Sequence, residues 1–97
     1  MIDFPVCKIN LGLNITEKRP DGYNNIETVF YPVKWSDAIE IIEGGDKPFS
    51  LSISGLKVEG NSEENIIFKA YKLLSEACQL PNLKVYLHKV LPMGAGL

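Results

Sequence analysis

The sequence is poor in the residues that most often build metal and redox sites. It contains a single histidine, His88, so a site made of several histidines is excluded. The two cysteines, Cys7 and Cys78, are far apart in the sequence and lack the spacing of metal ligands. They are interpreted as reduced core thiols of a cytoplasmic protein, and no metal ligand is assigned.

The chain also lacks an excess of positive charge and any long apolar run. Its 97 residues have a formal net charge of −2, which argues against a nucleic-acid partner. No apolar run reaches the length of a membrane span, and no signal-peptide pattern precedes the first predicted strand, so no membrane partner is expected. The 45% hydrophobic and 23% charged residues are those of an ordinary globular protein, here one small domain or part of a larger one.

Alternating apolar residues predict several β-strands. From Ile9 to Thr16 apolar and polar residues alternate strictly, which is typical of a half-buried strand with a period of two. Pro20-Asp21-Gly22 predicts a turn, because proline presets φ and glycine tolerates positive φ. A second extended stretch should return from this turn over about residues 25–34. Further strands are predicted over residues 38–43, 49–54 and 83–88.

One helix is predicted between the last two of these strands. Asn61 or Ser62 can cap its N-terminus, Glu63 and Glu64 follow where the helix dipole favours acids, and Pro81 ends it. Its apolar side is a row of residues at helical spacing: Ile66, Ala70, Leu73 and Ala77, with Ile67 and Leu74 beside it.

This order of elements predicts an α+β domain in which helices cover one face of a mostly antiparallel sheet. A second helix is expected after Gly96 and should complete the cover. Without it, a large apolar face of the sheet would be exposed to water. The 97 residues by themselves are therefore expected either to fold poorly or to cover that face by self-association.

Lys8 and Asn10 are the first candidates for a functional site. They are two residues apart on a predicted strand, so they share a face, opposite the leucine row. A lysine and an amide that project together beside a sheet suit an anionic substrate. The simpler interpretation is a solvated strand face, since polar alternation needs no function.

Two further candidates offer an aromatic ring or an amide. Tyr23 and Asn24 follow the predicted turn, and Tyr23 either packs on the sheet or stacks on a base, since an aromatic face suits a planar ring. Asn65 and Ile66 open the helix and are interpreted as a cap-region amide and a core residue. An asparagine can otherwise read the edge of a nucleobase through its paired donor and acceptor.

The sharpest pattern is Pro92-Met93-Gly94-Ala95-Gly96, directly after a predicted strand and before the expected second helix. This pattern indicates the start of a phosphate loop, in which backbone N–H groups and a helix N-terminus hold the phosphates of a nucleotide. Proline and glycine also make ordinary loops, so the position of this segment favours the phosphate loop more than its composition does.

Five segments, in a specific order and spacing, cover nearly the whole chain. They are C-K-I-N-L-G-L (7–13), K-R-P-D-G-Y (18–23), E-T-V-F (27–30), E-N-I-I (64–67) and L-P-M-G-A-G-L (91–97). Together they resemble the GHMP kinase superfamily, and within it the kinases that act on 4-diphosphocytidyl-2-C-methyl-D-erythritol. The K-I-N-L segment followed by R-P-D-G-Y is specific to these kinases within the superfamily.

The resemblance implies the fold named after domain 2 of ribosomal protein S5, as in the N-terminal domain of GHMP kinases. It also implies transfer of the γ-phosphoryl group of ATP, with Mg²⁺, to the 2-hydroxyl group of the cytidine diphosphate substrate, in non-mevalonate isoprenoid biosynthesis. A lysine beside the reacting oxygen suits this chemistry, because phosphoryl transfer depends on positioning and charge compensation.

The resemblance also assigns roles to individual residues. By it, Lys8 lies beside the acceptor hydroxyl group, Asn10 helps to hold the substrate, and Tyr23 packs on the cytosine ring. Asn24 stands where the family usually has a histidine that contacts the cytosine, and an asparagine keeps both a donor and an acceptor. Cys7 replaces a common alanine. The implied ATP-binding residues are Val58, Asn65, Ile66, Lys89, Pro92, Gly94 and Gly96.

On the same grounds, residues 1–97 are interpreted as part of the N-terminal domain of such a kinase, interrupted within the glycine-rich loop. The rest of that loop, the family's catalytic aspartate and the C-terminal domain have no counterpart in the sequence. These 97 residues by themselves are therefore expected to show no measurable kinase turnover.

Two other interpretations stay open. One is a different GHMP small-molecule kinase, of the mevalonate or homoserine type, although the R-P-D-G-Y segment speaks against it. The other is a non-catalytic binding or assembly module on the same scaffold, as in ribosomal and translation-factor domains, since a fold does not determine a function. The acidic balance disfavours RNA as the partner of such a module.

Overall fold

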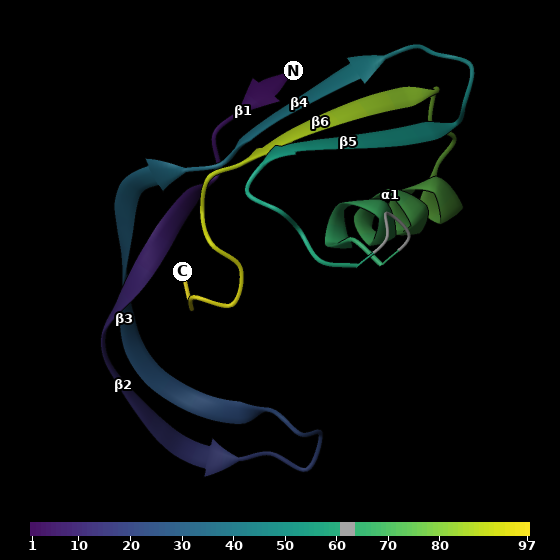
Figure 1. Cartoon of the computed structure of the whole chain (residues 1–97). Coiled ribbons are helices and arrows are strands. Elements are labelled where there is room, and N and C mark those ends of the chain that lie inside the picture. Colours follow the sequence, from purple (N-terminus) through teal and green to yellow (C-terminus); the bar gives the residue numbers. More distant parts are fainter. Residues whose placement is uncertain (61–63) are drawn as a thin grey trace.

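The computed structural model describes residues 1–60 and 64–97, in which the chain forms two β-sheets and one helix (Figure 1). The α+β class predicted from the sequence is confirmed, and every strand expected from alternation is present. The elements are β1 (Ile2–Asp3), β2 (Val6–Lys18), β3 (Asn24–Ser36), β4 (Ala38–Glu43), β5 (Phe49–Gly55), α1 (Ile66–Ala77) and β6 (Leu83–Lys89).

The larger sheet has the strand order β1-β4-β6-β5. Its β1–β4 and β4–β6 pairs are antiparallel, whereas β5 and β6 are parallel. Parallel neighbours need a crossover connection, and α1 supplies it between β5 and β6. The sheet is therefore mostly antiparallel, as expected, with the helix on one side of it (Figure 1).

β2 and β3 form a separate, long hairpin that curves away from the larger sheet, so the chain has two sheets where one was predicted (Figure 1). The predicted turn closes this hairpin. Gly22 donates its backbone N–H to the carbonyl oxygen of Arg19 at 3.2 Å and has φ +88°. Glycine adopts this φ without steric strain, which is why the turn forms at this place.

An aromatic cluster joins α1 to the larger sheet. Phe49, at the start of β5, stacks on Tyr71 with ring centroids 4.5 Å apart and meets Phe68 at 5.5 Å. Ring pairs in this range gain from their geometry as well as from the apolar area that they remove from water. The cluster therefore sets which side of α1 turns toward the sheet.

The apolar row predicted for the helix lies on the other side of α1. Ile66 is 79% exposed and Leu73 is 69% exposed, and Ala70 and Ala77 are exposed as well. The prediction was wrong because it followed aliphatic residues at helical spacing and passed over the two aromatic residues. Their rings have more area to bury and so decide the packing face.

The helix begins later than predicted. Its N-cap is Asn65, whose side-chain oxygen accepts a backbone hydrogen bond from the first turn at 2.9 Å. The predicted caps Asn61 and Ser62, together with Glu63, lie outside the described residues. Glu64 precedes the cap, so it stands before the first turn of the helix.

Few side chains are buried. In the described part of the chain they are Cys7 at the start of the hairpin, Val85 in the middle of β6, and Leu91 at the start of the glycine-rich segment. The apolar residues of the predicted half-buried strand form a strand, but they remain exposed: Ile9, Leu11, Leu13 and Ile15. Exposed apolar side chains thus lie on the hairpin, on the outer side of α1 and on the larger sheet, where they include Ile2, Ile42 and Tyr86. Self-association through them stays a prediction.

Replacing Phe49 with alanine should lower the free energy of unfolding by about 2–3 kcal/mol, because Phe49 contacts both aromatic residues of α1. The matched control Leu73→Ala removes an aliphatic side chain from the exposed side of α1 and should cost less than about 0.5 kcal/mol. Urea denaturation followed by far-ultraviolet circular dichroism measures both. Equal losses would contradict the packing face described above.

Candidate functional site

Four of the residues expected to bind ATP line one pocket. The pocket has a volume of about 350 Å³ and is bounded by the end of β6, the start of α1 and the loop after β5. Val58, Asn65, Ile66 and Lys89 all belong to its lining. The other lining residues are Pro5, Asp37, Ile39, Ile67, Leu87 and Met93. Segments that are distant in the sequence therefore converge where the resemblance places adenine.

The pocket combines apolar walls with a few polar groups. Aliphatic side chains of β4, β6 and α1 form the walls, and the polar side chains are those of Asp37, Asn65 and Lys89. Small-molecule sites commonly have this composition, because the apolar walls hold a ligand and the polar groups orient it. The arrangement suits an uncharged, planar and partly polar ring system.

Asn65 and Ile66 reach the pocket because α1 begins there. The interpretation of Asn65 as a cap is confirmed, since its Oδ1 accepts the backbone N–H of Ile67 at 2.9 Å. This bond occupies Oδ1, so a ligand at Asn65 would meet mainly its amide N–H donors. The interpretation of Ile66 as a core residue is wrong. As the first residue of α1, it lies ahead of the turn that packs on the sheet and is left exposed at the pocket.

Asp37, between β3 and β4, holds the end of β6. Its Oδ2 accepts a hydrogen bond from Lys89 Nζ at 2.7 Å, and its Oδ1 accepts the backbone N–H groups of Val90 at 2.7 Å and Leu91 at 2.8 Å. Its own N–H donates to the carbonyl oxygen of Pro5 at 3.2 Å. The side chains of the ion pair are only 12% exposed for Asp37 and 16% for Lys89.

These contacts decide the charge of Asp37. Burial raises its pKa, but the N–H of Leu91, the ammonium of Lys89 and the N–H of Val90 together outweigh burial and hold the pKa of Asp37 below its ordinary value. Asp37 is therefore ionised at neutral pH, and its charge balances that of Lys89 within the pocket wall.

Lys8 lies where the hairpin meets the glycine-rich segment. Its Nζ donates to the carbonyl oxygen of Gly96 at 2.5 Å, across 88 positions of sequence. The same ammonium is 5.8 Å from the centroid of the Phe30 ring, whose negative face attracts a cation. Two of the predicted site residues, one from each end of the sequence, are thus in direct contact.

A β-bulge in β2 changes which residues share the face of Asn10. Asn10 pairs with Phe30 and Leu13 pairs with Thr28, so β2 has one residue more than β3 in this interval, and Gly12 within it has φ +75°. The hydroxyl of Thr28 accepts from the Asn10 amide at 3.1 Å and donates to the Gly12 carbonyl at 2.5 Å. The prediction that the leucine row lies opposite Asn10 is therefore wrong from Leu13 onward.

The same face continues to the tip of the hairpin. β3 has no extra residue between Asn24 and Val33, so Asn24 shares a face with the residues that pair with Lys8 and Asn10. Lys8 reaches the glycine-rich segment from this face, and Figure 1 shows that segment on the inner side of the curve of the hairpin. Lys8, Asn10 and Asn24 therefore lie on the concave face of the hairpin.

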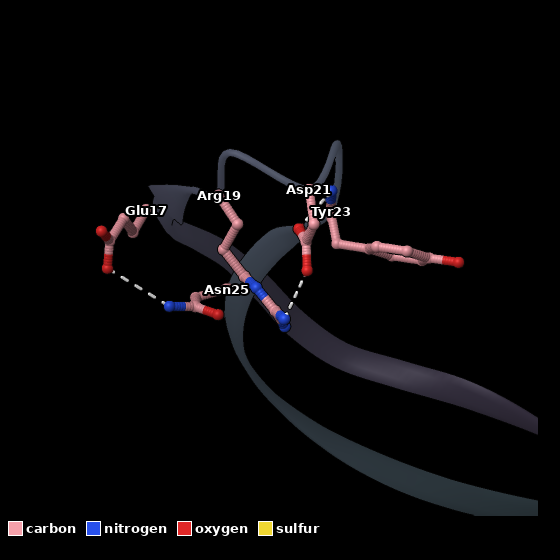
Figure 2. Close-up of polar contacts among 5 residues, drawn as sticks. All are labelled: Glu17, Arg19, Asp21, Tyr23 and Asn25. Carbon is pink, nitrogen blue, oxygen red and sulfur yellow. Dashed lines mark hydrogen bonds and ion pairs between the residues drawn. The ribbon is translucent and has the colours of Figure 1, made fainter.

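Tyr23 lies at the tip of the hairpin and is 72% exposed. Its backbone N–H donates to Asp21 Oδ1 at 3.0 Å, and Asp21 Oδ2 is paired with Arg19 at 2.5 Å. Nearby, Asn25 donates to Glu17 at 3.3 Å, and Figure 2 shows the Tyr23 ring extending away from these polar contacts. The alternative in which Tyr23 packs on the sheet is wrong, because its polar neighbours hold the turn and leave the ring outside.

The glycine-rich segment leaves β6 through the buried Leu91. Gly94 and Gly96 have φ of +70° and +75°, a conformation that favours glycine. Successive N–H groups around such residues form concavities that bind anions. Pro92, Met93 and Gly94 line a second pocket, and Met93 also belongs to the first, so the two are adjacent. The remaining residues of the second pocket are Leu56, Lys57 and Glu59.

Metal-ligating side chains do not gather in the described residues, where no group of three or more histidine, cysteine, aspartate or glutamate side chains is found. Both cysteines are unpaired. Cys7 is buried, as predicted, whereas Cys78 is exposed because it lies just beyond the last turn of α1. Across residues 1–60 and 64–97, no helix combines the length and apolarity needed to cross a membrane.

Of the ten residues that line the first pocket, only four were predicted as site residues, and Asp37 and Met93 are among those that were not. Met93 lies inside the glycine motif, so its place between Pro92 and Gly94 is a usable signal. Asp37 has no comparable signal. Its partner Lys89 is 52 positions away, and a single aspartate between two strands has the appearance of an ordinary polar connection.

No protein-family model matches the chain. Several curated proteins named 4-diphosphocytidyl-2-C-methyl-D-erythritol kinase do. That of Bacteroides fragilis is 56% identical over 99 residues, that of Cytophaga hutchinsonii 50% over 97, and that of Chlorobium chlorochromatii 44% over 92. These matches include 100%, 100% and 94% of this chain but only 36%, 35% and 31% of the relatives, so the chain spans about a third of their length.

The solved structures agree with this result. A crystal structure of 4-(cytidine 5'-diphospho)-2C-methyl-D-erythritol kinase matches with a TM-score of 0.74 at 30% sequence identity, covering 99% of this chain and 34% of that one. The resemblance inferred from the five segments is confirmed. Over its length the chain is homologous to part of these kinases and has the α+β fold of a GHMP kinase N-terminal domain.

The Asp37 contacts predict how stability depends on pH. Because the pKa of Asp37 is lower in the folded chain than in the unfolded chain, its contribution is present at neutral pH and is lost as the pH falls below about 4 and through the folded pKa. At pH 7 the Asp37→Asn variant should be less stable than the unchanged chain by about 1–3 kcal/mol. Urea titrations at pH 7 and pH 3 should show this gap closing in acid. A gap of the same size at both values would contradict the prediction.

Proposed function

We propose that this chain is the nucleotide-facing and substrate-facing part of a cytoplasmic kinase of non-mevalonate isoprenoid biosynthesis. The reaction transfers the γ-phosphoryl group of ATP to the 2-hydroxyl group of 4-diphosphocytidyl-2-C-methyl-D-erythritol. The observation that carries this proposal is the convergence of Val58, Asn65, Ile66 and Lys89 on one pocket. This pocket adjoins the glycine-rich segment that Lys8 contacts.

The pocket fits the adenine end of ATP. A neutral purine has two apolar faces and a polar edge, which match aliphatic walls and a few donors and acceptors. The ion pair of Asp37 and Lys89 adds no net charge to the wall. Asn65 lines the pocket and uses its Oδ1 within the helix cap, so its amide N–H groups are the donors that it can offer to the ring nitrogens of a purine.

The glycine-rich segment suits the phosphates. Pro92 and Gly94 follow the buried Leu91 and line the second pocket, which adjoins the first through Met93. Gly96 comes two residues later, where its carbonyl oxygen accepts from Lys8. Two glycines with positive φ allow backbone N–H groups to turn toward a bound anion. A nucleotide with adenine in the first pocket would therefore direct its phosphates toward this segment and toward Lys8.

The concave face of the hairpin suits the second substrate. Lys8 is the proposed catalytic residue, because its ammonium can leave the Gly96 carbonyl and compensate the charge that develops on the transferred phosphoryl group. Asn10 and Asn24 supply hydrogen bonds from the same face. Tyr23 offers an exposed ring for the cytosine at the tip of the hairpin.

Mg²⁺ belongs to the proposed reaction as the ion that neutralises phosphate charge. In proteins, Mg²⁺ is usually bound by phosphate oxygens of the substrate and one or two carboxylates. No ligand is assigned to it in this chain, and no step is derived through it.

An Ile66→Trp variant tests the adenine pocket, because its larger side chain should fill the pocket while its exposed position spares the fold. Binding of the ATP analogue AMP-PNP, measured by isothermal titration calorimetry, should weaken by at least about tenfold, or about 1.4 kcal/mol. The control Leu73→Trp, on the exposed side of the same helix, should bind like the unchanged chain. Equal affinities in all three chains would contradict the pocket assignment.

Residues 1–97 should bind the nucleotide without catalysing transfer. Among the described residues, the carboxylates that line the two pockets are Glu59 and Asp37, and Asp37 is already committed to Lys89 and two backbone N–H groups. Neither belongs to the hairpin whose concave face is proposed to hold the second substrate, so neither is assigned to align or activate the acceptor hydroxyl group. A single-turnover assay with radiolabelled ATP and the cytidine diphosphate substrate should yield no phosphorylated product. Detectable product would show that the 97 residues suffice.

A further inference from the structure

We propose that Asp37 is the positioning residue of the nucleotide pocket. It holds the Lys89 ammonium against the pocket wall and fixes Val90 and Leu91, the two residues that lead into the glycine motif at Pro92. This inference rests on the proposed nucleotide site and adds to it a residue that acts through others.

The two oxygens of the carboxylate have separate partners. Oδ2 accepts from Lys89 Nζ at 2.7 Å, while Oδ1 accepts from the backbone N–H groups of Val90 and Leu91 at 2.7 and 2.8 Å. Lysine has a flexible four-carbon stem, so its ammonium stays in one place only when a partner holds it. Hydrogen bonds to an ionised carboxylate are stronger than neutral ones, and partial burial protects this pair from screening.

Asp37 is itself held in place from a third direction. It lies at the short connection between β3 and β4, and its N–H donates to the carbonyl oxygen of Pro5, just before β2 begins. Pro5, Asp37 and Lys89 all line the first pocket. The carboxylate therefore relates the start of the hairpin, the end of β6 and the glycine-rich segment to one another.

The backbone contacts carry this effect onward to the phosphate side. Leu91 is buried, and Met93, two residues later, lines both pockets. A shift of the segment at Val90 and Leu91 would move Met93 and the N–H groups around Gly94. Oδ2 of Asp37 holds Lys89 in the pocket proposed for adenine, whereas Oδ1 holds the backbone that leads to the segment proposed for the phosphates. The two carboxylate oxygens thus position residues for two parts of one nucleotide.

A double-mutant cycle on residues 1–97 separates positioning from general stabilisation. Asp37→Asn loses the ion pair with Lys89 but keeps an oxygen that can accept from Val90 and Leu91. When Lys89 is present, Asp37→Asn should weaken AMP-PNP binding by at least about fivefold. In a Lys89→Met background the same substitution should weaken binding by less than about twofold, because no ammonium is left to position. Isothermal titration calorimetry at pH 7 gives the four affinities. The same loss in both backgrounds would overturn the inference, since a structural effect does not depend on Lys89.

A second measurement tests the backbone contacts independently of the nucleotide. Amide hydrogen exchange at Val90 and Leu91, taken relative to that of the β5 and β6 amides in the same variant so that a change in overall stability cancels, should accelerate by at least about tenfold in Asp37→Ala and remain close to the ratio of the unchanged chain in Asp37→Asn. Unchanged exchange in Asp37→Ala would overturn the inference, because the carboxylate would then not hold this segment. Circular dichroism of each variant verifies that the chain is folded.

The matched control is Glu43→Gln, which removes a carboxylate from the far end of β4, outside the first pocket. Its AMP-PNP affinity should stay within about twofold of the unchanged chain, and a larger loss would attribute the Asp37 effect to overall charge. The two proposals fail differently. An unchanged chain that does not bind AMP-PNP overturns the proposed function together with this inference, whereas normal binding with equal Asp37→Asn losses in the two backgrounds overturns the inference alone.

Discussion

The arrangement of this chain depends on one ionised carboxylate that is shared among three segments. Few side chains are buried, so apolar packing alone does not relate the hairpin, the larger sheet and the glycine-rich segment to one another. Asp37 does so through a lysine, two backbone N–H groups and its own N–H. An exposed ion pair contributes little to stability. This pair is partly buried, and both oxygens of the Asp37 carboxylate accept hydrogen bonds, so removing one partner leaves partly buried polar groups without a hydrogen bond.

The second organising feature is the bulge at Gly12. One extra residue in β2 brings Leu13 to the face of Asn10, while β3 continues its alternation to Asn24 without interruption. By this register, polar residues at the root of the hairpin and at its tip lie on one face, although they are far apart along the strands. Figure 1 shows that the hairpin is curved. The contact between Lys8 and Gly96 turns this face toward the glycine-rich segment. Local backbone geometry thus determines which side chains a single ligand can meet.

Which features could be predicted from the sequence depends on how far apart in the sequence the interacting residues are. The alternation that predicts β5 and β6 and the turn at Pro20-Asp21-Gly22 involve neighbours in the sequence, and both are confirmed. The pocket residues Val58 and Lys89 come from the family resemblance, and no local pattern brings them together. The packing face of α1 is missed because Phe49, 22 positions before Tyr71, decides it. The role of Asp37 is missed for the same reason, because Lys89, the nearest in sequence of the residues that bond to its carboxylate, lies 52 positions later.

The register of the β2–β3 hairpin determines on which face each of its exposed apolar residues lies. Leu13, Ile15 and Phe30 share the concave face with Asn10, whereas Ile9 pairs across the other face. A face that mixes apolar contact area with amides and an ammonium resembles the wall of a small-molecule site more than one side of a folded core. The concave face therefore matches the needs of a ligand that carries both a ring and phosphates.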